Sequence, residues 1–117
     1  QAVPEILPHP NAYCGFIKYI KAFGQLRLED TIRKITGVTA QWLGMEKRGT
    51  LKEGNFADVV VFDEKTLEPN ENHIEPRQKP KGIRFVFVNG KLTVQDGEHT
   101  GARSGAVLRF NKKELFR

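Results

Sequence analysis

The sequence feature that most constrains the fold is the apolar run VVVF at residues 59–62, within the segment RGTLKEGNFADVVVFD at residues 48–63. Consecutive apolar, mostly β-branched residues are typical of a strand that is buried on both faces. Gly49 and Gly54 bracket the residues between them, and glycine favours tight turns because it tolerates positive φ. The segment therefore predicts a strand, a turn and then a buried core strand. None of its side chains is a convincing nucleophile or metal ligand.

A β-hairpin is predicted downstream of this core strand. Apolar side chains alternate over residues 83–88, which predicts a strand with one apolar face. The Asn-Gly pair at residues 89–90 favours a two-residue type I′ turn, and residues 91–94 supply the returning strand. The Asp-Gly pair at residues 96–97 predicts another turn, before a loop that contains His99.

Helical periodicity dominates the first third of the chain. Apolar residues recur at helical spacing over residues 15–23, which predicts an amphipathic helix that Gly24 ends. A second helix is predicted from Leu28 to near Gly37, with acidic residues in its first turn and basic residues in its last. Thr39 is then predicted to cap a short turn that ends at Gly44. Such apolar stripes are typical of a hydrophobic core.

His9 is the most suggestive histidine in the sequence. Three prolines make residues 1–10 an extended connector, and His9 stands between two of them. An imidazole in a stiff loop can bind or orient a ligand, or it can simply form a hydrogen bond within its own loop.

The polar, proline-containing stretch of residues 64–81 predicts a long surface loop. A loop of this length is functional, packed on a partner or mobile. His73 lies in it between Glu71 and Glu75, and these three residue types could in principle bind a hard metal ion. A flexible loop offers no geometric template for such a site, so this pattern alone does not predict one.

Composition and charge limit the possible function classes. The chain has 117 residues, 38% of them hydrophobic and 28% charged, and no apolar run approaches the roughly 20 residues of a membrane helix. The net charge of +5 permits attraction to nucleic acid, but the basic residues are dispersed and no RNA-reading motif accompanies them, so a solvated surface is favoured. The single cysteine, Cys14, excludes an internal disulfide and fits a cytoplasmic location, as a structural thiol.

The sequence predicts no catalytic residue and no metal ligand of its own. Metal-assisted hydrolysis needs several ligands that converge on one point. His9, His73 and His99 are scattered, and no His-x-His pair, nucleophile elbow, Walker loop or dinucleotide fingerprint is present. The chain begins at Gln1 without methionine or a signal-peptide pattern, so we expect a longer natural chain or a processed one.

Four stretches resemble one enzyme family. The glycines and the Ala-Asp pair of residues 48–63 resemble a segment near the C-terminus of amidohydrolase-superfamily enzymes. HPNAY at residues 9–13, VNG at residues 88–90 and DGEHTGARSGAVLR at residues 96–109 resemble the last part of N-acyl-D-amino-acid deacylases, also called D-aminoacylases. The resemblance covers almost the whole chain up to Arg109.

The resemblance implies an α+β fold in two parts. Residues 1–44 would be the terminal helices of a (β/α)8 metal-dependent hydrolase barrel, and residues 45–117 would be strands of a small composite β-sandwich with a C-terminal tail. A complete barrel takes about 250 residues and cannot fit within this chain. The segment would therefore complete and stabilise barrel and sandwich, with the rest of the barrel as its partner, and would not be catalytic alone.

The resemblance also implies a reaction, a cofactor and two site residues. The parent reaction would be hydrolysis of an N-acyl amide of a D-amino acid by metal-bound hydroxide, with one or two zinc ions and an aspartate general base. All of these groups would precede Gln1. His9 and Asn11 would lie at the rim of the pocket and bind the small N-acyl amino acid.

Departures from the family pattern leave alternatives open. Many D-aminoacylases read His-Pro-Arg, near the substrate carboxylate, where this chain reads His9-Pro10-Asn11; asparagine cannot supply the bidentate guanidinium fork. Cys14-Gly15 likewise replaces the common Gly-Thr. Dihydroorotase-like and imide-hydrolysing relatives share the Ala-Asp stretch. Outside the enzyme class, the chain could be a free-standing basic β-rich binding module, or a structural piece that associates with a separate barrel subunit.

Overall fold

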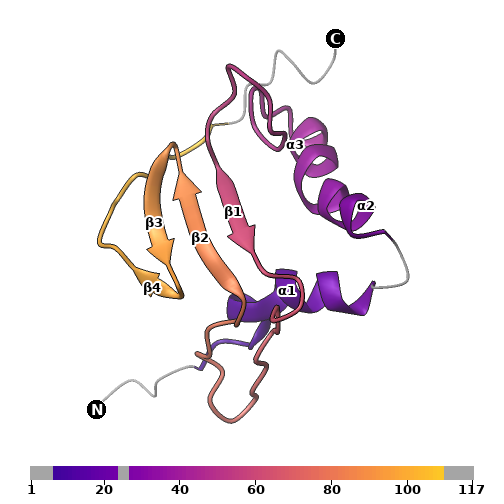
Figure 1. Ribbon diagram of the computed structural model, residues 1–117, viewed down its shortest axis with the longest axis vertical. Helices are drawn as coiled ribbons and strands as arrows, with labels where there is room; N and C mark the ends of the chain where they lie inside the picture. Colours follow the sequence, from indigo (N-terminus) through magenta and orange to yellow (C-terminus); the bar gives the residue numbers. More distant parts are fainter. Residues whose placement is uncertain (1–6, 24–26, 110–117) are drawn as a thin grey trace.

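The computed structural model describes residues 7–23 and 27–109 (Figure 1). In this part of the chain all helical elements precede all strands. The elements are α1 (Asn11–Ala22), α2 (Leu28–Arg33), the π-helix η1 (Lys34–Val38), α3 (Thr39–Trp42), β1 (Val59–Phe62), β2 (Ile83–Val88), β3 (Lys91–Gln95) and β4 (Glu98–His99). Gly24, the predicted end of the first helix, residues 1–6 of the predicted connector and the whole predicted tail at residues 110–117 lie outside the described residues.

Helix α1 begins at Asn11, four residues before the predicted start at Gly15. Its first turn is closed by the carbonyl oxygen of Pro10, which accepts hydrogen bonds from the backbone N–H groups of Tyr13 (2.9 Å) and Cys14 (3.1 Å). The apolar periodicity starts only at Phe16, so the sequence pattern does not predict this first turn. Proline is compatible with a helix start. The backbone N–H groups of the first turn have no partner within the helix, so the N–H that proline lacks is not needed there.

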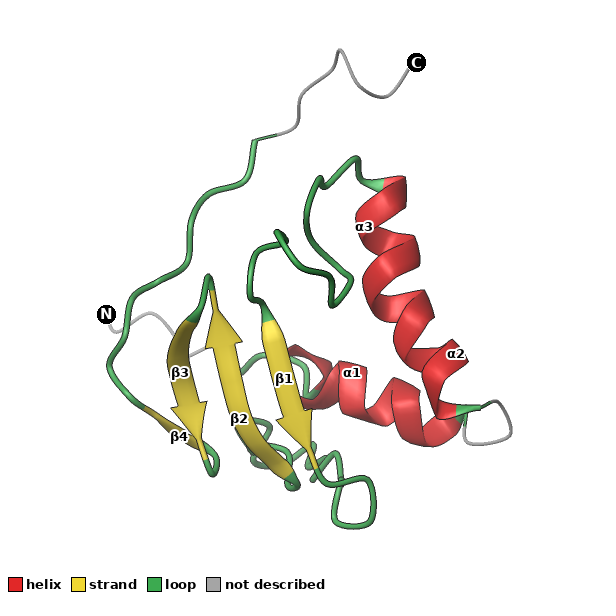
Figure 2. Cartoon of the chain, turned by 45° about the horizontal axis from the view of Figure 1, so that its top comes forward, coloured by secondary structure: helices red, strands yellow, loops and turns green. Residues whose placement is uncertain are grey.

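The second predicted helix does not end near Gly37. Helices α2, η1 and α3 follow one another without a break from Leu28 to Trp42, and Figure 2 shows them as one rod. Thr39 is not a cap, because its hydroxyl donates to the carbonyl oxygen of Lys34, five residues back (2.8 Å), inside the π-helical turn. The predicted end at Gly44 is confirmed: its φ is +64°, and the N–H of Met45 reaches the carbonyl oxygen of Ala40 (2.8 Å).

The strands form one antiparallel sheet in the order β1-β2-β3-β4. The predicted hairpin is confirmed, with positive φ at both Asn89 (+49°) and Gly90 (+79°), as a type I′ turn requires. The second predicted turn, at Asp96 and Gly97, joins β3 to β4. His99 lies in β4 and not in a loop as predicted.

Strand β1 is present as predicted, but it is not buried on both faces. The side chains of Val60 and Val61 are 53% and 42% exposed. Within the described residues, β1 pairs only with β2, and the helices lie beside the β1 edge of the sheet (Figures 1 and 2). The first of the two strands predicted within residues 48–63 is absent, because residues 45–58 form turns and irregular backbone.

Part of the buried core lies where α1 and α2 meet the loop that joins β1 to β2, since the buried residues Ile20, Thr31 and Leu67 come together there. Leu67, in the stretch predicted to be a polar surface loop, is buried together with Cys14, Ile20 and Ala40. Cys14 is a structural thiol, since its Sγ donates to the carbonyl oxygen of Pro10 (3.3 Å). Every helix in the described ranges is too short or too polar to cross a bilayer.

Candidate functional site

His9 lies exposed immediately before α1 and is bonded to the start of that helix. Its Nδ1 accepts the backbone N–H of Asn11 (3.2 Å), and its carbonyl oxygen accepts the N–H of Ala12 (3.0 Å). Because Nδ1 is an acceptor here, the neutral imidazole carries its proton on Nε2. His9 therefore stabilises the first turn of α1 and retains Nε2–H as a hydrogen-bond donor.

Asn11, the other predicted site residue, is the first residue of α1 and is also exposed. Its backbone N–H is bonded to His9, while its side-chain amide makes no hydrogen bond to the described residues. The two predicted residues thus lie together at one end of the helix. What they offer a ligand are the neutral donors and acceptors of an imidazole and an amide.

The loop between β1 and β2 brings further side chains to His9. The His73 and His9 ring centroids are 5.6 Å apart, with an interplanar angle of 83°, an edge-to-face contact. Oε1 of Glu71 accepts a hydrogen bond from Nζ of Lys18 (2.6 Å) and lies 3.2 Å from Nε2 of His73. We refer to His9, Lys18, Glu71 and His73 as the His9 cluster.

Sequence reasoning did not find the His9 cluster as a unit. Lys18 and Glu71 are 53 positions apart, and no spacing rule links residues so distant in the chain. Glu71 and His73, which the sequence offered with Glu75 as possible metal ligands without predicting a site, are in contact. Among residues 7–23 and 27–109, no three His, Cys, Asp or Glu side chains are arranged so that they could hold a metal ion.

The Lys18–Glu71 contact is expected to be lost on acidification. The hydrogen bond from Lys18, supported by the charges of Lys18 and His73 and opposed by partial burial, lowers the pKa of Glu71 below its ordinary value of 4.5. A lowered folded-state pKa means that the stabilisation is present above about pH 4.5 and is lost as the pH falls through the folded-state value. In an NMR titration from pH 7 to 3, the amide signals around Glu71 should therefore shift with a midpoint below 4.5, and Glu71→Gln should remove this step. A midpoint at or above 4.5 would contradict the contact.

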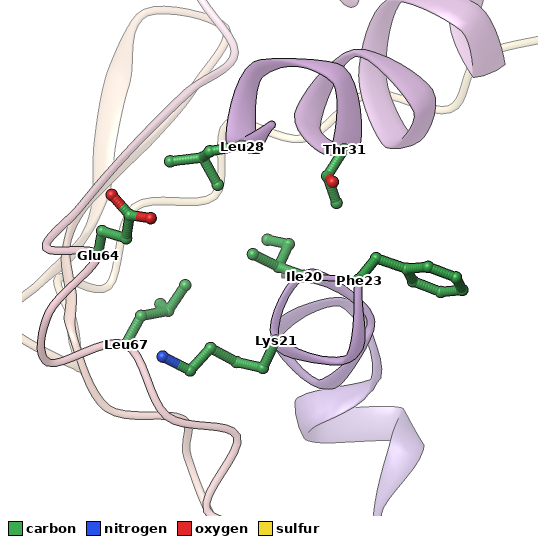
Figure 3. A pocket seen from close by; sticks show the side chains of 7 residues that line it. All are labelled: Ile20, Lys21, Phe23, Leu28, Thr31, Glu64 and Leu67. Carbon is green, nitrogen blue, oxygen red and sulfur yellow. The ribbon is translucent and has the colours of Figure 1, made fainter. Parts of the chain in front are cut away.

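A small cavity lies near the C-terminal end of α1, next to α2. Its volume is about 150 Å³, and Figure 3 shows Ile20 of α1, Leu28 of α2 and Leu67 of the β1–β2 loop around it. Lys21 and Glu64 add one charge of each sign to its lining. It contains no histidine or activated nucleophile, and the hydroxyl of Thr31 donates to the backbone of Arg27 (3.4 Å). The cavity is therefore a gap in packing between helices and loop, without catalytic groups.

A second polar network joins three of the four family-like stretches. Arg48 forms an ion pair with Asp58 and donates from Nη2 to Oδ1 of Asn89 (2.8 Å). The backbone N–H of Asn89 donates to Oδ1 of Asp58 (2.8 Å), and its side-chain amide donates to the carbonyl oxygen of Ser104 (2.6 Å). We refer to these four residues as the Arg48 network. It joins the segments at residues 48–63, 88–90 and 96–109, which sequence reasoning had singled out separately.

The Arg48 network also fixes the charge of its carboxylate. The backbone N–H of Asn89 and then the Arg48 guanidinium lower the pKa of Asp58 below its ordinary value of 3.8, although partial burial opposes this. The guanidinium lies over the Phe56 ring, 4.2 Å from its centroid, so Arg48 is held by both charge and packing. These contacts stabilise the fold and contain no group poised for catalysis.

Comparison with known proteins identifies relatives along most of the chain. A model of the amidohydrolase family matches residues 15–94. A D-aminoacylase from Alcaligenes xylosoxydans xylosoxydans is 37% identical in an alignment of 105 residues that covers 86% of this chain and 22% of the relative. An N-acyl-D-aspartate deacylase from the same organism is 39% identical in an alignment of 106 residues that covers 86% of this chain and 21% of the relative. A dihydroorotase from Endomicrobium trichonymphae is 45% identical over 42 residues, 36% of this chain and 10% of that relative.

Solved structures give the same assignment. A D-aminoacylase structure described with a binuclear metal centre superposes with a TM-score of 0.79 at 33% identity, over 84% of this chain and 22% of that chain. A D-aminoacylase variant in complex with CuCl2 superposes with a TM-score of 0.81 at 34% identity. The superposition covers 86% of this chain and 22% of that chain. The chain thus spans about a fifth of the length of the relatives that it matches. The chain belongs to the amidohydrolase family, in which it is similar to D-aminoacylases over more than four-fifths of its length.

Proposed function

We propose that this chain is the C-terminal part of a metal-dependent amidohydrolase that hydrolyses N-acyl amides of D-amino acids. The observation that carries the proposal is the similarity, at 36–39% identity over 105–106 residues, to a D-aminoacylase, an N-acyl-D-aspartate deacylase and an N-acyl-D-glutamate deacylase. These relatives share an N-acyl-D-amino-acid substrate by name and differ in its side chain. The proposal therefore specifies the substrate class and leaves the side chain open.

In this proposal, residues 1–44 are the end of the catalytic barrel and residues 45–117 belong to the flanking β-sandwich. The order of elements supports it, because the described helices all precede residue 44 and the described strands all follow it. Exposed apolar side chains support it as well: Phe16 and Trp42 on the helices are 72% and 80% exposed. Exposed aromatic residues on helices are typical of a surface that packs against another part of the protein.

The proposed metal is bound outside the part of this chain that the structure describes. Residues 7–23 and 27–109 hold no set of side chains that fits a zinc ion, so no chemical step is assigned to them. When bound by the rest of the barrel, one or two zinc ions would polarise the amide carbonyl and generate hydroxide. This segment contributes by completing the fold and by placing His9 and Asn11 at the pocket rim, with the rest of the barrel as its partner.

The alternative of a free-standing basic binding module receives less support. Several cations on the sheet and its loops are paired with carboxylates and do not form a patch: Lys79 with Glu98, Lys81 with Glu68, and Arg84 with Asp96. A binding surface for an acidic partner needs unpaired cations that act together.

The proposed function is tested by assaying the natural protein that carries this segment, with zinc supplied. We expect hydrolysis of N-acetyl-D-amino acids in preference to the L enantiomers, and loss of activity with a chelator. Asn11→Arg should lower KM by roughly tenfold, since a guanidinium makes a charge-assisted bond to the substrate carboxylate that an amide cannot.

Gln41→Arg is the matched control for that variant, because it adds the same charge at an exposed position of α3. It should leave KM unchanged. Hydrolysis of dihydroorotate without hydrolysis of any N-acyl amino acid would refute the proposed substrate class and favour the dihydroorotase-like relatives instead.

A further inference from the structure

We propose that His73, held by Glu71, is a positioning residue for His9, so that the loop between β1 and β2 sets the geometry of the pocket rim. This inference rests on the proposed function, in which His9 contacts the substrate. Neither the sequence pattern nor the comparisons assign a role to Glu71 or His73. The β1–β2 loop thereby acts on a site that belongs to the start of α1.

The two imidazole rings contact each other in an edge-to-face geometry. The His9 imidazole is bonded at Nδ1 to the N–H of Asn11, but this single bond does not stop the ring from tilting. The His73 ring packs edge-to-face against the His9 ring, with a distance of 5.6 Å between the two ring centroids. Edge-to-face contacts have a preferred geometry, so His73 restricts the orientations that His9 can adopt.

His73 is itself held in place by Glu71. Its Nε2 lies 3.2 Å from Oε1 of Glu71, and the same oxygen accepts a hydrogen bond from Lys18 of α1. Glu71 thus fixes the histidine and also ties the loop to the helix that follows His9. Its side chain is only 23% exposed, whereas both partners of the Glu68–Lys81 pair at the base of the same loop are 63% exposed. Partial burial strengthens the contacts of Glu71 relative to such a surface pair.

The loop between β1 and β2 is anchored at its base. Leu67 is buried, and Glu68 and Lys81 form a β-bridge with paired backbone hydrogen bonds of 3.2 and 2.9 Å. Asn70 donates from its side chain to the carbonyl oxygen of Lys79 (3.2 Å), so the two arms of the loop are joined again above the bridge. A loop anchored in this way can hold His73 in a defined place against α1.

The test is a double-mutant cycle on His9 and His73 in the natural protein that carries this segment, with N-acetyl-D-amino acids as substrates. His73→Ala should raise KM by roughly three- to tenfold, the effect of losing one partly exposed polar contact, and should change kcat less than twofold. In the His9→Ala background, His73→Ala should have no further effect, because His73 acts through His9. Glu71→Ala should reproduce the increase in KM, and Glu71→Gln, which keeps an acceptor oxygen, should restore part of it.

The control variant is Glu68→Gln, which breaks the exposed ion pair in the same loop without touching either histidine, and should leave KM unchanged. Additive effects of His9→Ala and His73→Ala, or an unchanged KM in His73→Ala, would overturn the inference while the proposed function stands.

A second readout does not depend on activity. With 13C-labelled histidine in the same protein, the imidazole signals of His9 should shift in His73→Ala and Glu71→Ala, and not in Glu68→Gln. If the wild-type protein hydrolyses no N-acyl amino acid, the proposed function fails, and these signals still decide whether His73 positions His9. Unchanged His9 signals in both variants would overturn the inference.

Discussion

Gly49→Ala is expected to lower the free energy of unfolding by about 3–4 kcal/mol, the largest loss of any single substitution considered. Gly49 has a φ of +77°, where a side chain is strained. An alanine Cβ there would lie 2.5 Å from Cβ of Ala40 and 2.9 Å from the carbonyl oxygen of Thr36. Because both neighbours belong to the long helix, neither can move without disturbing it, and the segment before β1 would separate from that helix.

Gly54→Ala is the matched control for this substitution. Gly54 has a similar φ of +84°, but no atom lies within 4 Å of the position that its Cβ would take. Only the backbone strain remains, so the loss should be about 1 kcal/mol. Urea denaturation of both variants measures the difference between their free energies of unfolding, given equal m-values. Equal losses would show that the close approach of Gly49 to the helix does not contribute to stability.

Arg48→Met is expected to cost about 2–3 kcal/mol of stability, because it removes the residue at the centre of the Arg48 network. The Arg48 side chain is only 13% exposed. Its loss would break the ion pair with Asp58 and the hydrogen bond to Asn89, and would remove the cation from the face of Phe56. Methionine keeps the apolar stem, so the effect reports mainly the guanidinium.

The corresponding control is Arg27→Met. Arg27 forms an exposed pair with Glu29 at 3.6 Å, and its side chain is 77% exposed, so its removal should cost no more than about 0.5 kcal/mol. Acid denaturation adds a second readout. The lowered pKa of Asp58 stabilises the fold above its ordinary pKa of 3.8, and this contribution is lost as the pH falls through the folded-state value. Arg48→Met should reduce this pH dependence without removing it, because the Asn89 backbone bond to Asp58 remains. Equal costs for the two arginines would contradict the role of the network.

Local patterns predicted the hairpin of β2 and β3 better than the helices. The Asn-Gly turn at residues 89–90 was predictable because both positions need positive φ and few residues tolerate it. The break predicted near Gly37 was wrong because tertiary packing overrode local propensity: the helix continues there, with the would-be Cβ of Gly37 only 3.3 Å from the carbonyl oxygen of Gly49. The apolar run of β1 predicted a strand correctly, but periodicity cannot tell which part of a protein covers its faces.

The candidate site was predictable only in part. His9 and Asn11 could be named because they belong to one short motif, and in the structure the backbone N–H of Asn11 donates to Nδ1 of His9. The contacts of His9 with His73 and of Lys18 with Glu71 could not be inferred, since they join residues more than fifty positions apart and depend on the path of a long irregular loop. The same limit applies to the Arg48 network, whose members were noticed as separate motifs.

The intact mass of the protein isolated from its natural source tests most directly whether this chain works as the C-terminal part of a larger amidohydrolase. The aligned D-aminoacylase is roughly four times as long as this chain, since 105 aligned residues are 22% of it. We therefore expect a single polypeptide several times heavier than 13.3 kDa, with a His-x-His metal-binding segment ahead of Gln1. A mature polypeptide of 13.3 kDa would contradict the account and would leave a free-standing or partner-associated module.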